Sequence, residues 1–416
     1  MAMINLSKEA TVGKALTPIA ILMMLSFPVA SQAAGLVIKN GTVYNANGVP
    51  VVDINKPNGS GLSHNIWDNL NVDKNGVVFN NSANESSTSL AGNIQGNSNL
   101  TSGSAKVILN EVTSKNPSTI NGMMEVAGDK ADLIIANPNG ITVNGGGSIN
   151  TGKLTLTTGT PDIQDDKLAG YSVNGGTITL GKLDNASPTE ILSRNVVVNG
   201  KVSADELNVV AGNNYVNAAG QVTGSVSATG SRNGYSVDVA KLGGMYANKI
   251  SLVSTEKGVG VRNLGVIAGG VNGVSIDSKG NLLNSNAQIQ SASTINLTTN
   301  GTLDNTTGTV TSVGTISLNT NKNTIVNTRA GNISTMGDIY VNSGTIDNTN
   351  GKLAAAGMLA VDTNNATLIN SGKGSSVGIE AGLVALKTGT LNNSNGQIRG
   401  GYVGLESAAL NNNNGD

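Results

Sequence analysis

The chain has 416 residues, of which 38% are hydrophobic, 12% charged and 2% aromatic, and its formal net charge is −1. This hydrophobic content with almost no net charge argues against intrinsic disorder, while the scarcity of charged and aromatic residues argues against an ordinary compact globule. The near-zero charge, with no basic run, also gives no footprint for a nucleic-acid partner.

The amino end predicts an export signal. Two lysines precede an apolar run from Ala15 to Ala30, and residues 31–33 are small or polar, with alanine last. This pattern is typical of a secretory signal peptide over residues 1–33, with cleavage between Ala33 and Ala34. A membrane anchor is the alternative, but the run is short, contains two prolines and ends at a small-residue site. We therefore expect the mature chain to leave the cytoplasm.

Asn137, Pro138, Asn139 and Gly140 predict a tight turn between two strands. Proline fixes φ at the second position, and Asn and then Gly accept positive φ. An apolar run ends just before this turn, and the next one begins at Ile141. From these residues alone the turn needs no role beyond building a corner.

Phrases between residues 35 and 265 form one colinear series, which includes Pro50–Ile54, Gly61–Asn65, Gly76–Ser82, Ala131–Ile141, Leu154–Gly159 and Gly258–Gly265. The series resembles the amino-terminal secretion domain of two-partner secretion exoproteins, the group of the filamentous haemagglutinins and the contact-dependent growth inhibition effectors. The resemblance implies that residues 34–265 are that domain and residues 266–416 a repeat shaft.

The resemblance also implies a route and its partners. The Sec machinery would deliver the chain unfolded to the periplasm of a Gram-negative bacterium. Periplasmic recognition domains of an outer-membrane β-barrel transporter would then capture it, and the chain would fold outside as a right-handed parallel β-helix. The protein would be secreted or displayed on the cell surface, where it could meet a receptor on a host or neighbouring cell. The sequence contains no cysteine, so no disulfide would obstruct the passage of an unfolded chain.

Two short motifs mark the secretion domain of this family. Asn-Pro-Asn-Gly is intact at residues 137–140, and the place that matches Asn-Pro-Asn-Leu reads Asn97, Ser98, Asn99 and Leu100. The family proline is therefore Ser98 here, which leaves open any role that needs a rigid turn. The resemblance implies that these eight residues serve secretion, by keeping a folding nucleus intact.

A phrase of one apolar residue, any residue and Asn recurs through the second half of the chain. Its asparagines are Asn263, Asn284, Asn305, Asn327, Asn348, Asn370, Asn393 and Asn412, and successive copies are 21, 21, 22, 21, 22, 23 and 19 residues apart. A fixed period near 20 residues indicates stacked repeats. Asparagine at one place in every coil can form a hydrogen-bonded ladder along the stack.

Short runs in each repeat alternate apolar and small polar residues, as strands with one buried face do. Gly and Asn separate these runs and tolerate tight corners. We therefore predict an all-β solenoid, a parallel β-helix, with Ile, Leu and Val inside and Thr, Ser, Lys and Asp outside. The family resemblance further implies short capping and extra-helical strands near the amino end. A leucine-rich repeat has a similar period but needs more leucine and a helix in each unit.

The sequence offers little for catalysis. His64 is the one histidine, so any Ser-His-Asp triad must use it, and we expect a structural, hydrogen-bonded role instead. The counts exclude metal sites built from His and Cys clusters, and no cofactor is predicted. Trp67 is expected in the core or the cap near the start of the β-helix.

Three classes of function compete. The first, a secreted adhesin or toxin-delivery filament, follows from the resemblance. The second is a polysaccharide-acting enzyme on a β-helix, which would need clustered carboxylates that the sequence lacks. The third, an outer-membrane barrel, disagrees with the low aromatic content.

The last residues, 411–416, do not resemble a polar cap. We therefore expect an amino-terminal fragment with a truncated shaft and no enzymatic activity of its own.

Overall fold

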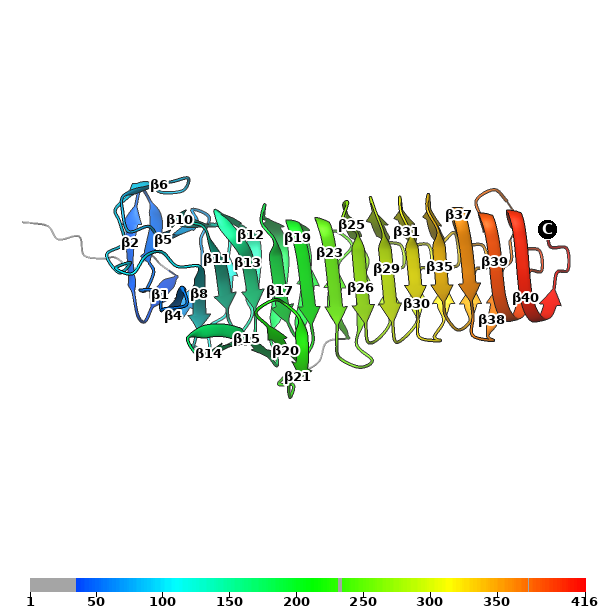
Figure 1. Ribbon diagram of the computed structural model, residues 1–416, viewed down its shortest axis with the longest axis horizontal. Coiled ribbons are helices and arrows are strands. Elements are labelled where there is room, and N and C mark those ends of the chain that lie inside the picture. The colour runs from blue at the N-terminus through cyan, green and yellow to red at the C-terminus, as the bar shows by residue number, and fades with distance from the viewer. Residues whose placement is uncertain (1–34, 231–233, 373) are drawn as a thin grey trace, which may run out of the picture.

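The computed structural model describes residues 35–230, 234–372 and 374–416. All regular elements in these ranges are strands, and they form one long rod with the amino end at one tip and β40 (Ile398–Asn411) near the other (Figure 1). The expected signal peptide, residues 1–33, and its cleavage site at Ala33 and Ala34 lie outside the described residues. Within those residues, no helix is long and apolar enough to cross a membrane.

The amino tip is closed by short antiparallel pairs. Strand β1 (Leu36–Ile38) pairs antiparallel with β4 (Leu62–Leu70), and β2 (Thr42–Ala46) pairs antiparallel with β3 (Val49–Asp53). Strand β3 then pairs parallel with β5 (Val77–Asn81), where coil stacking begins. This arrangement confirms the expected capping strands, and Trp67 is fully buried beneath them.

From there the chain winds in coils whose strands pair parallel with those of the next coil. The early strands are β8 (Val107–Val112), β9 (Ser118–Ile120), β10 (Met123–Gly128), β11 (Ala131–Ala136), β12 (Ile141–Ile149), β13 (Thr151–Thr157), β16 (Thr177–Asp184), β17 (Thr189–Ser193), β18 (Asn195–Val198), β19 (Lys201–Ala211), β22 (Tyr235–Val239) and β23 (Gly244–Ser254).

The regular shaft has three strands in each coil, which stack into three parallel strand columns. The first column contains β24 (Gly260–Asn263), β27 (Leu282–Leu283), β30 (Leu303–Asp304), β33 (Ile325–Val326), β36 (Ile346–Asp347) and β38 (Thr367–Ile369). The second contains β25 (Val266–Gly269), β28 (Gln288–Ser291), β31 (Thr309–Ser312) and β34 (Asn332–Thr335). The third contains β26 (Val274–Ser278), β29 (Ile295–Thr299), β32 (Ile316–Asn319) and β35 (Ile339–Asn342). Two longer strands, β37 (Lys352–Asp362) and β39 (Gly378–Asn392), bend through a corner and continue the columns toward β40.

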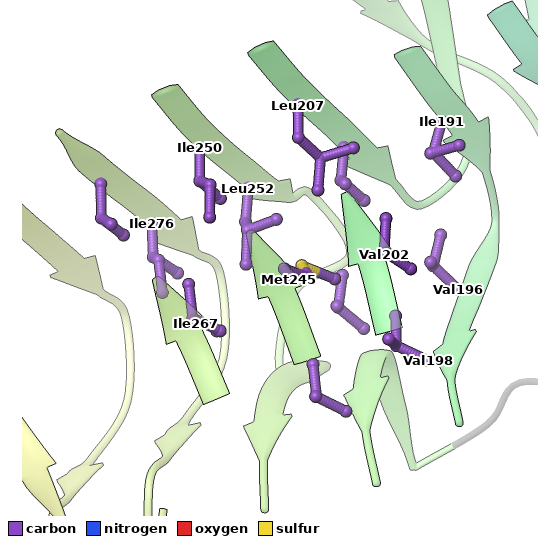
Figure 2. Close-up of a cluster of buried hydrophobic side chains, with 14 of the residues drawn as sticks. Ile191, Val196, Val198, Val202, Leu207, Met245, Ile250, Leu252, Ile267 and Ile276 are labelled. Carbon is purple, nitrogen blue, oxygen red and sulfur yellow. The ribbon is translucent and has the colours of Figure 1, made fainter. Parts of the chain in front are cut away.

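One aliphatic core runs along the rod. Alternate residues of each strand point inward, as the period-2 pattern predicts, and they form a continuous cluster from Leu36 to Leu391. Figure 2 shows Leu207 and Ile250 pointing into this interior, toward Val202 and Met245 near the starts of the same long strands, β19 and β23. Because each coil covers its neighbours, a narrow interior suffices for small aliphatic side chains, and few aromatic residues are needed.

The repeated asparagines form the predicted ladder. Each side-chain amide nitrogen donates to the side-chain oxygen of the next asparagine, in an unbroken series from Asn263 to Asn412 with nitrogen-to-oxygen distances of 2.7–2.9 Å. All members except Asn412 are buried. Most amides also donate to a backbone carbonyl of the following coil, as Asn284 does to Thr309 at 3.1 Å. The ladder therefore fixes the register of the first strand column.

One detail of the side-chain orientation was predicted wrongly. Serine and threonine were expected outside, but one hydroxyl of each coil is buried at the corner that follows the third strand column, at Ser278, Thr299, Thr320, Ser343 and Thr363. Each of these hydroxyls donates to a backbone carbonyl within the corner, as Thr299 Oγ1 does to Gly301 O at 2.7 Å. A buried hydroxyl is tolerated there because it finds an acceptor within its own corner and is not left without a hydrogen bond.

A separate four-stranded antiparallel sheet lies against the flank of the rod. Its strands, in spatial order, are β14 (Thr160–Gln164), β15 (Lys167–Val173), β20 (Asn214–Asn217) and β21 (Val222–Ser225). A small hairpin of β6 (Ser86–Thr88) and β7 (Gly92–Ile94) stands nearer the tip (Figure 1). Both confirm the extra-helical strands expected near the amino end.

Candidate functional site

The candidate site consists of the two asparagine turns near the amino end. The first, residues 97–100, follows β7, and the second, residues 137–140, connects β11 to β12. Asn97 and Asn137 are almost completely inaccessible to solvent, whereas Ser98 and Asn139 are exposed. The sequence therefore places one buried asparagine at the start of each turn and presents the middle of the turn to solvent.

The second turn closes through two hydrogen bonds. The Gly140 N–H donates to the Asn137 carbonyl at 3.1 Å, and the Asn139 N–H donates to the Asn137 side-chain oxygen at 3.0 Å. Only Gly140 has positive φ, at 112°, so the prediction that Asn139 also takes positive φ was wrong. The turn uses negative φ at both central positions, and its asparagine side chain takes the place of a further backbone acceptor.

The same asparagines join this turn to the preceding coil. The Asn137 amide donates to the Asn116 carbonyl and to Ser118 Oγ, both at 2.9 Å. The Asn139 amide donates to the Ser114 carbonyl at 2.8 Å. Because these partners lie 19 to 25 residues earlier in the chain, the motif fastens one coil to the one before it.

The first turn repeats this geometry without its proline. The Asn99 N–H donates to the Asn97 side-chain oxygen at 2.9 Å, and the Leu100 N–H donates to the Asn97 carbonyl at 3.2 Å. The Asn97 amide donates to the carbonyls of Ile54 and Asn80, at 2.9 and 3.0 Å. Ser98 therefore leaves the hydrogen bonds of the turn intact.

The fourth residues of the two turns differ in a way that the backbone explains. At Gly140 a β-carbon would lie 3.0 Å from the Thr177 carbonyl oxygen, and φ is positive, so only glycine fits without strain. Leu100 has no such constraint and buries its side chain in the main core. The second turn thus ends at a glycine that lies close to the backbone of another coil, and the first ends at a leucine whose side chain is part of the core.

Sequence reasoning did not identify the partners of the two motifs. Ser114, Asn116 and Ser118 on one side, and Ile54 and Asn80 on the other, accept the amide hydrogen bonds. Most of these acceptors are backbone carbonyls, which leave no signature in the sequence. Their one signal is position, since the partners of the second motif lie about one coil before it.

His64 makes the kind of contact that the sequence predicts for a structural histidine. Its Nε2 lies 2.7 Å from Glu111 Oε2 on the neighbouring strand β8. Its strand neighbour Trp67 donates from Nε1 to the side-chain oxygen of Asn110 at 3.1 Å. Neither contact assembles a nucleophile with a base, so both tie β4 to the first coil. Across the described residues, no group of three His, Asp or Glu is placed to hold a metal ion.

The extra-helical sheet meets the rod through a second core and a charged cluster. Tyr171 on β15 is buried between the two, and burial, with the nearby Glu190 carboxylate, raises the pKa of its phenol far above the ordinary value. Lys153 Nζ lies 2.9 Å from Glu190 Oε2 at the same contact. Burial also raises the pKa of the neighbouring Asp132 carboxyl, although Lys153 opposes the shift.

Comparison with known proteins places this geometry among secretion domains. A family model described as the TPS secretion domain matches residues 29–284. A protein named toxin CdiA from Yersinia pestis is 45% identical over 258 residues, which are 61% of this chain and 8% of that protein. The tRNA nuclease CdiA-2 of Burkholderia pseudomallei (strain 1026b) is 41% identical over 260 residues, again 61% of this chain and 8% of that protein.

A solved structure agrees with these sequence matches. The crystal structure of the filamentous hemagglutinin secretion domain superposes with a TM-score of 0.56 at 30% identity, and the match covers 84% of this chain and all of that one. None of these matches is a polysaccharide-acting enzyme. The chain spans less than a tenth of the length of the two CdiA proteins.

Proposed function

The chain belongs to the TPS secretion domain family, that of the two-partner secretion exoproteins, and on this premise we propose that its amino-terminal part directs export through a cognate outer-membrane transporter. The observation that carries the proposal is the family match over residues 29–284, joined to a structural match to the filamentous hemagglutinin secretion domain that covers 84% of this chain. The protein is accordingly a secreted or cell-surface protein.

The proposed route begins with Sec-dependent transfer of an unfolded chain to the periplasm. Recognition domains of the transporter then capture residues 34–265, and the shaft of residues 266–416 follows through the barrel. Two features support this order. The chain has no cysteine to crosslink it, and each coil rests on the coil before it, so the rod can grow from its capped amino tip outward.

For the full-length protein we propose delivery of a toxic domain to a neighbouring cell. The support is the 41–45% identity to CdiA proteins that are named as a toxin and a tRNA nuclease. Adhesion to a host cell is the second candidate, favoured by the structural match to the filamentous hemagglutinin secretion domain. In either case the toxic or adhesive region would lie outside the segment shared with these relatives. This chain would direct the export of the protein and form part of its extended shaft.

We propose that the two asparagine turns serve export as coil clamps. The asparagines of the two turns hold together segments that are 17 to 45 residues apart in sequence. A chain that emerges from a pore must form its first coils before later coils can stack, and these amide contacts fasten those first coils. The proposed role is therefore in folding at the exit, with the side chain at the second position of each turn, Ser98 or Pro138, dispensable.

Co-expression tests the export proposal. The chain is expressed in Escherichia coli with its cognate transporter, with the transporter lacking its periplasmic domains, and without a transporter, and the culture medium is assayed. Export should occur only with the intact transporter, while an unrelated periplasmic reporter stays in the cell in all three cultures. Equal amounts of the chain in the medium of all three cultures would contradict the proposal.

A further inference from the structure

A shallow trough of about 790 Å³ runs along the outer face of the third strand column, from β29 to β40. Side chains that point outward at two positions of each coil form its two walls, and the backbone between them forms the floor. The trough lies outside the segment that matches the secretion domain family, which ends at residue 284. Its residues are not involved in the asparagine turns.

One wall is low in the middle because its residues are small. Tyr340 stands in register with Ala360, which pairs with Ala385, which pairs with Gly404. Three successive coils thus carry a methyl group or a hydrogen where the earlier coil carries a tyrosine. The hollow beyond the Tyr340 ring therefore follows from the small residues that succeed it at this position of the repeat.

A second tyrosine, Tyr402, lines the trough on β40. Tyr402 is 66% exposed, and its ring extends across Gly404, where an added β-carbon would lie 3.3 Å from Tyr402 Cε1. Glycine at this position lets the ring lie along the sheet and expose one face. Tyr340, 41% exposed, has its hydroxyl 3.4 Å from Asp338 Oδ2. The two rings are separated by three coil steps, which is about 14 Å at the usual strand spacing.

The opposite wall is polar. Asn319, Asn342, Asp362, Lys387 and Glu406 follow one another along it. The oxygens of Asn319 and Asp362 accept backbone N–H groups two residues on, at 3.0 and 2.7 Å, and the Asn342 oxygen accepts the Asn364 amide at 2.8 Å. Among the described residues, the side-chain nitrogens of Asn319 and Asn342 have no hydrogen-bond partner. The wall thus offers donors and acceptors at fixed positions.

The charges of the trough exclude a polyanion. Lys387 is its one cation, and Nζ lies 3.4 Å from Glu406 Oε1. With Asp362 and Glu406 against Lys387, the lining carries a formal charge of −1. Nucleic acids and sulfated polysaccharides require a concentration of Lys and Arg, which this surface lacks. A strongly cationic ligand gains little either, since one of the two carboxylates is already paired.

We propose that this trough binds a neutral oligosaccharide. Sugar rings present flat C–H faces that pack on exposed aromatic rings, and their hydroxyl groups both donate and accept hydrogen bonds. Tyr340 and Tyr402 supply two such rings, and the small residues between them leave room for the chain of sugars. The amide and carboxylate groups of the opposite wall can form hydrogen bonds with the sugar hydroxyls. This site is independent of the proposed export function, because none of its residues contacts the asparagine turns.

Binding of defined neutral hexasaccharides to the whole mature chain tests the proposal. Maltohexaose, cellohexaose, mannohexaose and chitohexaose are titrated by calorimetry and by saturation-transfer NMR, with a heparin hexasaccharide as the polyanionic comparison. We expect saturable binding of at least one neutral ligand and none of heparin. Tyr340→Ala and Tyr402→Ala should each weaken that binding about tenfold, and Ala385→Arg should abolish it by filling the trough.

Tyr246→Ala is the matched control. Tyr246 lies on the early strand β23, where its ring packs against Lys201 outside the trough, so its loss should leave the affinity unchanged. Circular dichroism of each variant verifies the fold, and the tested positions are on the outer surface, where truncation is tolerated. The proposal is overturned if no neutral hexasaccharide binds, if heparin binds in their place, or if Ala385→Arg leaves the binding unchanged.

Discussion

Asparagine serves this molecule in three ways that depend on where its amide group points. In the turns at Asn97 and Asn137 the buried amide fastens neighbouring coils, and in the ladder it bonds to the next asparagine. At exposed corners such as Asn286 and Asn350 it takes positive φ, which few other residues accept. A short polar side chain with both a donor and an acceptor suits all three roles.

The change of Ser98 to proline should stabilise the protein. The Ser98 N–H has no hydrogen-bond partner among the described residues, and the turn has the same hydrogen bonds as the one that contains Pro138. Proline would restrict the unfolded chain without straining the folded one, so Ser98→Pro should raise the free energy of unfolding by about 0.4–1 kcal/mol. Denaturant titration measures the change, and Pro138→Ser should cost a similar amount. A destabilised Ser98→Pro variant would refute the equivalence of the two turns.

The sequence was enough to locate the residues of the two turns, but it did not predict the contacts that these residues make. The motif residues and their turn follow from proline and glycine, whose backbone preferences are local. The conformation of Asn139 and the contacts to Ser114 and Asn116 depend on the preceding coil, which local preferences do not describe. The buried hydroxyl at Thr299 escaped prediction for a related reason, since the same residue type faces solvent elsewhere in the repeat.

Within the strand columns, the asparagine ladder should contribute locally to stability. Asn327 lies in the middle of it and is fully buried, and its removal would leave the oxygen of Asn348 and the carbonyl of Lys352 without their donor. Asn327→Ala should therefore lower the free energy of local unfolding by about 3 kcal/mol. Amide hydrogen exchange of the flanking coils measures the loss.

Asn412→Ala is the control for the ladder. Asn412 is exposed and ends the series, so its replacement should cost under about 1 kcal/mol. If the two substitutions lower the stability equally, the ladder does not stabilise the stacked coils, and its hydrogen bonds are only a consequence of their register.

The contact between the extra-helical sheet and the rod should depend on pH through Asp132. Its pKa in the folded protein is raised above the ordinary 3.8 because it is partly buried. A proton on Asp132 therefore favours folding, and this contribution is lost as the pH rises through the raised pKa. At pH 7 the charged carboxyl is a cost, so Asp132→Asn should stabilise the protein, by no more than about 1 kcal/mol after solvent screening.

The advantage of Asp132→Asn should shrink as the pH falls toward 4, because the wild-type carboxyl then becomes neutral as well. Thermal unfolding of both proteins between pH 4 and pH 7 measures the difference. Asp166→Asn, at the exposed turn between β14 and β15, controls for the loss of a charge without burial. An advantage that grows toward pH 4 would show that the sign of the Asp132 shift is wrong.

At the scale of the whole molecule, periodicity explains why so much of the fold was predictable. A coil of about 20 residues must place the same kinds of residue at the same corners, so the ladder, the aliphatic interior and the parallel stacking all appear as a repeated phrase. The amino-terminal cap and the flanking sheet are not periodic. Their pairings, such as β1 with β4 and β15 with β20, join segments with no common pattern. Only their presence, implied by the family resemblance, could be anticipated.

The central claim is that the asparagine turns serve secretion by clamping the first coils. The most direct test compares the export of turn variants with their stability. Asn137→Ala, Pro138→Ser and Ser98→Pro are each expressed with the cognate transporter, and the secreted fraction of each is compared with its free energy of unfolding. We predict one common trend, in which Asn137→Ala loses both stability and export, while the two turn-preserving variants keep export because each shifts the free energy of unfolding by no more than about 1 kcal/mol. Loss of export in Pro138→Ser, with a loss of stability no larger than this, would contradict the account, because a turn that is needed apart from folding must be recognised by the transporter itself.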